Sequence, residues 1–155
     1  MVAQTVTIRT CDESDLEHFE RFGSSRHAQY CREQFARGGE ALTILVATGD
    51  DGLPVGKLHL DFEERADRRE AVLLAAGVAV ELQSRGIGTQ LMEQAEQLVL
   101  DRGWDTIVLG VEDFNPRARE LYERLGYVAC EPHDFAYEGA PVPNPGVWMR
   151  KELRR

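Results

Sequence analysis

Apolar and polar residues alternate in some parts of the chain and recur every three to four positions in others, which predicts strands and helices respectively. Strands are expected at 5–10, 41–48, 53–63, 71–80, 104–111, 127–130 and 146–153. Helices are expected at 14–22, 25–36, 86–101 and 116–125. The resulting order, β-α-α-β-β-β-α-β-α-β-β, predicts an α/β fold in which a mixed central sheet of about seven strands carries helices on both faces.

The ends of the expected helices carry local signals. Ser14 and Glu17 match the S-x-x-E capping box, which predicts that the first helix begins at Ser14. Asn115 is a favourable N-cap residue, and Pro116 suits the first position of the last helix. The strand at 71–80 is apolar along almost its whole length, so it is expected near the centre of the sheet.

Composition narrows the class of protein. A length of 155 residues fits a single domain, which we expect to span 1–155. No apolar run approaches the ~18–20 residues of a membrane span, and the N-terminal stretch does not resemble a signal peptide, so a cytoplasmic location is expected. A net charge of −9 argues against general nucleic-acid binding and against anionic membrane surfaces, but it suits a cationic amine substrate.

The cysteines and histidines give no indication of a metal site. Cys11, Cys31 and Cys130 are widely spaced, and neither a C-x-x-C pair nor a Cys/His cluster is present in the sequence. We therefore expect reduced thiols that serve as packing residues, and no bound metal.

The stretch Gln83-Ser84-Arg85-Gly86-Ile87-Gly88 joins an expected strand to an expected helix. The first turn of a helix presents N–H groups without intrahelical partners, together with the positive end of the helix dipole. Glycines at 86 and 88 let an anion approach those N–H groups, and Arg85 adds a positive charge, so the stretch suits a phosphate group. A tight turn in which glycine serves only the geometry is the alternative. The dinucleotide fingerprint G-x-G-x-x-G is absent because residue 91 is Leu91.

This stretch resembles the Q/R-x-x-G-x-G/A motif of the GNAT superfamily of N-acetyltransferases. The segment NPRARELYERLGYV at 115–128 resembles the N-x-x-A-x-x-L-Y-x-x-x-G-F/Y pattern of the same family, and the expected element order matches the GNAT fold over nearly the whole chain. The resemblance implies direct transfer of an acetyl group from acetyl-CoA to a primary amine, most simply that of a small molecule. A peptide N-terminus or lysine acceptor and a non-catalytic acyl-CoA-binding module are the two alternatives.

The resemblance also implies a V-shaped opening between the fourth and fifth strands that holds acetyl-CoA. The pyrophosphate would lie on the N–H groups of 85–89, the pantetheine arm along the fourth strand, and backbone N–H groups near Val78 beside the oxyanion. Tyr122 would be the general acid, because a phenol with a pKa of about 10 is protonated at neutral pH. The expected contacts with acetyl-CoA are Val78, Ala79, Val80, Gln83, Ser84, Arg85, Gly86, Ile87, Gly88, Thr89, Asn115, Ala118 and Tyr122.

The general base is less well defined by the sequence. Residues 71–78 carry no acid, and Gly110 stands where ribosomal-protein N-terminal acetylating relatives would carry a glutamate. Glu112 lies on the same strand face as residue 110 by period-two counting, which makes it the candidate base. Asp61, Glu63, Glu64 and His133 are the alternatives.

The acceptor pocket is expected from the first two helices and the 131–146 loop. These segments supply aromatic residues and acids that suit a cationic amine or ordinary packing: Phe22, Tyr30, Phe35, Phe135 and Tyr137. Homodimerisation through the C-terminal strands is a further expectation, because GNAT-like domains often associate.

Overall fold

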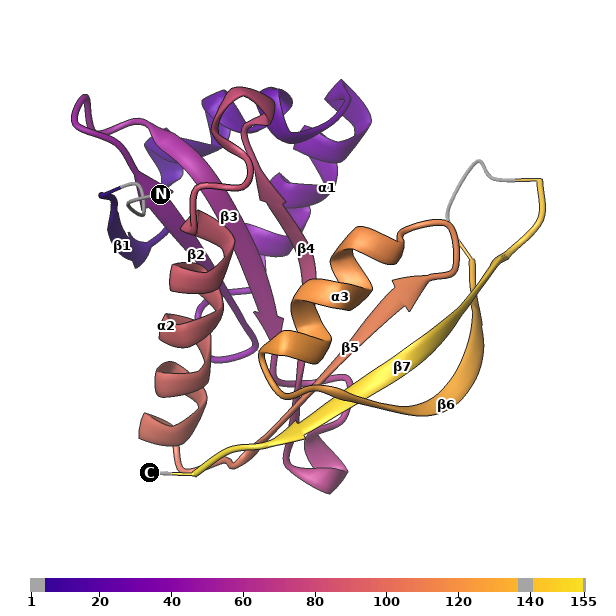
Figure 1. The fold of residues 1–155 in the computed structure, drawn as a ribbon. Helices are drawn as coiled ribbons and strands as arrows, with labels where there is room; N and C mark the ends of the chain where they lie inside the picture. Colours follow the sequence, from indigo (N-terminus) through magenta and orange to yellow (C-terminus); the bar gives the residue numbers. More distant parts are fainter. Residues whose placement is uncertain (1–4, 137–140, 155) are drawn as a thin grey trace.

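A computed structural model describes residues 5–136 and 141–154, and its elements follow the predicted order (Figure 1). The strands are β1 (Thr7–Thr10), β2 (Leu42–Thr48), β3 (Pro54–Asp61), β4 (Glu70–Val78), β5 (Thr106–Glu112), β6 (Val128–Phe135) and β7 (Asn144–Glu152). The α-helices are α1 (Ser25–Ala36), α2 (Ile87–Asp101) and α3 (Pro116–Arg124). The 3-10 helices are η1 (Glu13–Phe22), η2 (Ala66–Arg68) and η3 (Val80–Leu82).

The seven strands form one mixed sheet in the order β1-β2-β3-β4-β5-β7-β6. β4 lies at its centre, as its apolar sequence predicts. It pairs antiparallel with β3 and parallel with β5, and the parallel ladder contains only the pairs from Glu70–Thr106 to Leu73–Leu109. Beyond Leu73 the two strands diverge, which leaves a fork at the middle of the sheet (Figure 1).

Helices cover both faces of the sheet, and each face has its own apolar core. On one face, α2 places Ile87, Leu91 and Ala95 against Leu58 and Leu60 of β3. On the other face, η1 and α1 pack on β2 through Phe19, Cys31 and Val46, together with Cys11, Leu16, Leu42 and Ile44. Full burial of each large apolar side chain contributes roughly 1.5–3 kcal/mol, so these two faces fix the helices in place.

The start of the first helix differs from the prediction. Its N-cap is Asp12, whose carboxylate accepts from the Ser14 backbone N–H, while the Asp15 carboxylate accepts from the Asp12 N–H. The predicted Ser14–Glu17 box is therefore wrong. The capping box lies two residues earlier because Asp15 is buried there and forms a bidentate ion pair with Arg9 of β1 at 2.7 and 2.8 Å.

β6 is longer than the short strand predicted at 127–130. It continues to Phe135 through Pro132, a residue that sheets tolerate mainly on edge strands because it lacks an N–H donor. β6 is such an edge strand, since it stands at the end of the strand order and pairs with β7. Almost every residue of β6 is exposed, so apolar and polar residues do not alternate clearly along it, and the sequence predicts only its first part.

The three cysteines are free thiols, as expected. Cys11 and Cys31 are buried packing residues, whereas Cys130 is exposed, so the packing interpretation is wrong for Cys130. Within 5–136 and 141–154, no group of three or more His, Cys, Asp or Glu residues could hold a metal ion. Within the same residues, no helix has the length and apolarity needed to cross a membrane.

Candidate active site

The fork in the sheet is associated with a bulge in β4. The β3–β4 register shifts between Lys57 and His59, and Ala75 has a φ of 54°, in the left-handed region. A non-glycine residue in this region costs on the order of 1 kcal/mol or more, and such residues cluster at functional sites. Past Leu73, the side of β4 that faces the fork has no partner strand among residues 5–136 and 141–154, so its backbone can pair with an extended ligand.

The loop between β4 and α2 has the conformation of an anion site. Gly86 is the N-cap of α2 with a φ of 83° and no side-chain cap, so the first N–H groups of the helix lack that partner. Gly86 and Gly88 have different structural roles. Gly86 supplies the left-handed conformation, whereas a Cβ at Gly88 would meet only Leu121 Cδ2 at 3.8 Å. Gly88 therefore keeps open space beside the helix N-terminus.

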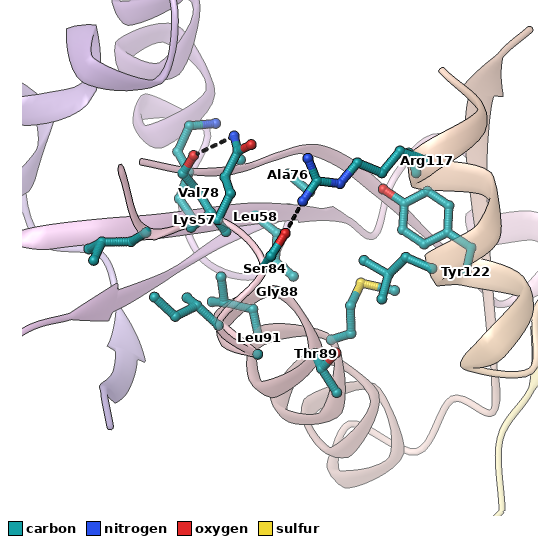
Figure 2. Close-up of a pocket in the computed structure, with 18 of the residues that line it drawn as sticks. Lys57, Leu58, Ala76, Val78, Ser84, Gly88, Thr89, Leu91, Arg117 and Tyr122 are labelled. Atoms are coloured by element: carbon teal, nitrogen blue, oxygen red, sulfur yellow. Dashed lines mark hydrogen bonds between the residues drawn. The ribbon is translucent and has the colours of Figure 1, made fainter. Parts of the chain in front are cut away.

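A cavity of about 590 Å³ lies between β4, the start of α2 and α3 (Figure 2). It brings together most of the predicted acetyl-CoA contacts: Val78, Gln83, Ser84, Gly86, Ile87, Gly88, Thr89, Asn115, Ala118 and Tyr122. It also includes residues outside that set of expected contacts: Lys57, Leu58, Ala76, Gly77, Leu82, Leu91, Met92, Arg117, Leu121 and Arg124.

Three predicted contacts do not line this cavity. Ala79 is buried, and its N–H already donates to Val55 O at 2.8 Å. Val80 is 79% exposed at the surface, and the Arg85 side chain is also exposed. Of the expected contacts on the fourth strand and just after it, only Val78 faces the cavity, and Gln83 Nε2 donates to its carbonyl at 3.2 Å.

Arginines of α3 place positive charge along the wall of the cavity. Arg117 contacts the Ser84 hydroxyl, which joins the start of α3 to the glycine loop (Figure 2). Arg124 also lines the cavity, whereas Arg119 lies near Glu123, at 3.9 Å. Together with the dipole of α2, Arg117 favours an anion beside the glycine loop.

Tyr122 projects from α3 into the cavity, while Asn115 caps that helix. Asn115 Oδ1 accepts from the Ala118 N–H at 3.3 Å and also lines the cavity, so capping and contact with a ligand are compatible. Burial raises the pKa of the Tyr122 hydroxyl, and the negative charge of Glu112 raises it further. The phenol is therefore protonated at neutral pH, as a general acid requires. Glu112 is half-buried near the end of β5 and does not line the cavity.

The alternative bases occupy other environments. Asp61 pairs with Arg37 at 3.0 Å and accepts from the backbone N–H groups of Glu63 and Glu64. Burial raises the pKa of Asp61, but these contacts outweigh it and hold the pKa below its ordinary value. The Glu63 carboxylate also pairs with Arg37, at 2.7 Å. Asp61 and Glu63 are thus bound in an ion-pair network.

Aromatic residues lie next to Gly110, the position at which the resemblance implies a glutamate in ribosomal-protein N-terminal acetylating relatives. A Cβ at Gly110 would lie 2.4 Å from Phe135 Cε1, so the ring of Phe135 occupies the space of a larger residue at 110. His133, Phe135 and Trp148 pack together, with His133 and Phe135 ring centroids 4.8 Å apart. His133 is therefore part of an aromatic cluster on the hairpin of β6 and β7.

Other aromatics expected at the acceptor pocket have different surroundings. Phe22 and Phe35 pack against the core beneath η1 and α1. Tyr30 packs there too, and its ring stacks on His59 with centroids 6.1 Å apart. Tyr137 lies outside the described residues.

His59 is expected to make the protein sensitive to acid. Burial, together with the smaller effects of the charges of Lys57 and His27, lowers its pKa to about 2. The unfolded chain therefore binds one more proton than the folded chain as pH falls below about 6.5, so stability is lost on that side. In urea unfolding, wild type is expected to lose about 2 kcal/mol more stability than His59→Gln between pH 7 and pH 5, with slopes that differ by up to about 1.4 kcal/mol per pH unit. Equal slopes for the two proteins would contradict this prediction.

This α/β protein therefore places an open side of β4 and an uncapped helix N-terminus beside one cavity. The sequence profile of the acetyltransferase (GNAT) family matches residues 8–127. The chain belongs to this family, as the resemblance of its motifs indicates.

Curated relatives agree with this assignment, and a solved structure has a similar fold. The chain is 29% identical over 129 residues to N-alpha-acetyltransferase 30 of Xenopus laevis, which covers 82% of this chain and 46% of the relative. It is 34% identical over 93 residues to mycothiol acetyltransferase of Beutenbergia cavernae, covering 60% and 30% of the two chains. The chain thus spans less than half the length of these relatives. The fold is similar to that of ribosomal-protein-S18-alanine N-acetyltransferase from Escherichia coli, with a TM-score of 0.75, 21% identity, and coverage of 97% and 96%.

Proposed function

We propose that this protein is an acetyl-CoA-dependent N-acetyltransferase that moves an acetyl group to a primary amine by direct attack in a ternary complex. One observation carries the proposal. A single cavity brings together the N-terminus of α2, the unpaired side of β4 and the Tyr122 side chain. These are the parts needed to hold a pyrophosphate, an extended amide-bearing arm and a leaving thiolate.

In this proposal the donor acetyl-CoA lies along the whole cavity. Its pyrophosphate lies on the N–H groups that follow Gly86, with Arg117 and Arg124 providing counter-charge. Its pantetheine amides pair with the free side of β4 near Ala76 and Val78. Asn115 and Ala118 contact the arm from α3. The thioester then lies between the β4 bulge and Tyr122.

The proposed chemistry forms one bond and breaks another. The neutral amine nitrogen attacks the thioester carbonyl carbon, and backbone N–H groups of β4 stabilise the resulting oxyanion. When the carbon–sulfur bond breaks, Tyr122 gives its proton to the CoA thiolate. Glu112 accepts the proton released by the amine, directly or through water. The raised pKa of Tyr122 keeps the phenol protonated until that step.

The acceptor is proposed to be a small-molecule amine. The resemblance between this chain and mycothiol acetyltransferase supports that class. A peptide N-terminus is the second candidate, because N-alpha-acetyltransferase 30 matches 82% of the chain. Gly110, with Phe135 packed on it, weighs against a site organised around a glutamate at that position. Homodimerisation and a cytoplasmic location stay predictions.

The test combines the purified protein with acetyl-CoA and a panel of polyamines, aminoglycosides, amino acids and short peptides, and measures release of free CoA thiol. Release with one class of amine would identify the acceptor, and release with peptides alone would favour the second candidate. CoA binding by calorimetry without release for any amine would favour the non-catalytic acyl-CoA-binding module. Absence of CoA binding would contradict the assignment of the glycine loop.

A further inference from the structure

The side chain of Lys57 is completely buried next to the β4 bulge, although lysine is rarely found in such a position without a carboxylate partner. It projects from β3 toward the core beneath η1 and α1, where its Nζ lies 5.7 Å from the centre of the Phe19 ring. Taking an ammonium group out of water costs several kcal/mol. A residue kept there at such a cost indicates a function beyond packing.

The contacts of Lys57 are with the bulge and with neutral groups. Nζ donates to the carbonyl oxygen of Ala75 at 2.6 Å and lies 3.1 Å from His59 Nε2. The other groups that act on its pKa are the thiols of Cys31 in α1 and Cys11 before η1. Burial lowers the pKa of Lys57 to about 8, and these thiols oppose that effect only in part. The shortest contact of the Lys57 ammonium group is thus with the carbonyl oxygen of the Ala75 peptide group.

That peptide group joins Ala75 to Ala76, at the point where β4 leaves β5. The described residues contain no cis peptide bond, so the Ala76 N–H points opposite to the Ala75 carbonyl and away from Lys57. Ala76 lines the cavity (Figure 2). A cation on the carbonyl polarises the whole peptide group, which makes the N–H on its other side a stronger donor.

We propose that Lys57 is a positioning residue for acetyl transfer, which holds the Ala75 carbonyl in the β4 bulge and thereby orients and polarises the Ala76 N–H toward the oxyanion. The proposal rests on the proposed function, because the oxyanion forms only if a thioester is attacked at the fork. It also accounts for the left-handed Ala75, since the contact of 2.6 Å offsets the strain of that conformation.

The first test is the resonance of the Ala76 amide in ¹H–¹⁵N NMR spectra of the full chain, followed from pH 6 to pH 10. In wild type this amide is expected to shift with a midpoint near pH 8 as Lys57 loses its proton. The neighbouring groups titrate elsewhere. Burial lowers the pKa of His59 to about 2 and that of His27 below 6.5, and it raises the pKa of Cys31 above 9 and of Cys11 to about 12. Burial also raises the pKa of Tyr30 above 10.

The second test compares kinetics and binding in Lys57→Met, which removes the donor and keeps an apolar side chain of similar length. The expected result is a kcat reduced about tenfold or more, with the dissociation constant of CoA unchanged. The ratio of wild-type kcat to variant kcat should decline above pH 8. Lys151→Met is the matched control, because Lys151 pairs with Glu96 at 2.9 Å and does not line the cavity. The control should keep the wild-type kcat.

Two results would overturn the role of Lys57. One is a chemical shift of the Ala76 amide that shows no change with a midpoint near pH 8 in wild type. This measurement uses only the wild-type protein, so it does not depend on the folding of a variant. The other is a wild-type kcat in Lys57→Met. If wild type transfers acetyl groups to no amine, the proposed function fails, and the NMR titration still decides whether Lys57 polarises this peptide group.

Discussion

Replacing Tyr122 by phenylalanine is expected to lower kcat about 100-fold or more, with little change in the affinity for CoA. The substitution removes only the hydroxyl, so the ring still fills its place on α3 beside the cavity. Without a proton donor, the CoA sulfur must leave as a thiolate or take its proton from water. A 100-fold loss corresponds to about 2.7 kcal/mol of transition-state stabilisation. Thiol release gives kcat, and calorimetry gives the dissociation constant of CoA.

Tyr127→Phe is the matched control for this experiment. The ring of Tyr127 lies 6.2 Å from that of Tyr122, but its hydroxyl donates to Glu96 and the residue does not line the cavity. This variant is expected to lose about 1 kcal/mol of stability with an unchanged kcat. A wild-type kcat in Tyr122→Phe, or an equal loss in both variants, would show that Tyr122 is a core tyrosine and not the acid.

Gly88→Glu is expected to weaken CoA binding about 100-fold, which is the second large effect. A carboxylate at this position lies where the phosphate groups would meet the first N–H groups of α2, and hydrogen bonds to charged groups contribute roughly 1.5–3 kcal/mol each. The fold tolerates a side chain there, because a Cβ would meet only Leu121 at 3.8 Å. Calorimetry at low and high salt measures the effect, which should be smaller at high salt.

Two further variants separate charge from bulk. Gly88→Gln has nearly the same size without the charge, and we expect it to weaken CoA binding only about tenfold. Gln94→Glu adds the same charge to an exposed position further along α2 and should leave binding unchanged. If Gly88→Glu and Gly88→Gln behave alike, steric exclusion and not repulsion of phosphate explains the result. Wild-type affinity in Gly88→Glu would place the phosphates elsewhere.

The part of the site that sequence could predict is the part encoded by local signals. The glycine pair before α2 and the Asn-Pro start of α3 each report the end of a helix, and helix ends are where backbone groups are free for a ligand. The order of strands and helices follows from periodicity, and α1 has the predicted bounds, Ser25–Ala36. These features depend on neighbours in the sequence, so a single chain contains enough information to find them.

The part that sequence could not predict depends on tertiary contacts. In β3 the polar residues Lys57, His59 and Asp61 alternate with apolar ones, a pattern typical of a strand with one face in water. The structure buries that face beneath η1 and α1, so Lys57 and His59 are core residues. The bulge at Ala75 was equally hidden, since nothing in the run of alanines and leucines indicates a left-handed residue. The sequence signal that could have pointed to this buried polar cluster was the presence of Lys57, His59 and Asp61 in a strand next to the centre of the sheet.

The fork also divides the sheet into two halves that are weakly joined. Strands β1 to β4 form one half and strands β5, β7 and β6 the other. In the described part of the chain, the ladder that joins the two halves is the short one from Glu70–Thr106 to Leu73–Leu109. At the base of this seam, the Glu70 carboxylate contacts Arg65 on one side and Arg150 of β7 on the other. An extended donor lying along β4 would occupy the place of the missing ladder. Bound acetyl-CoA would then hold the two halves of the sheet together. In the protein without CoA, the two halves would be more loosely coupled than in the protein with CoA bound.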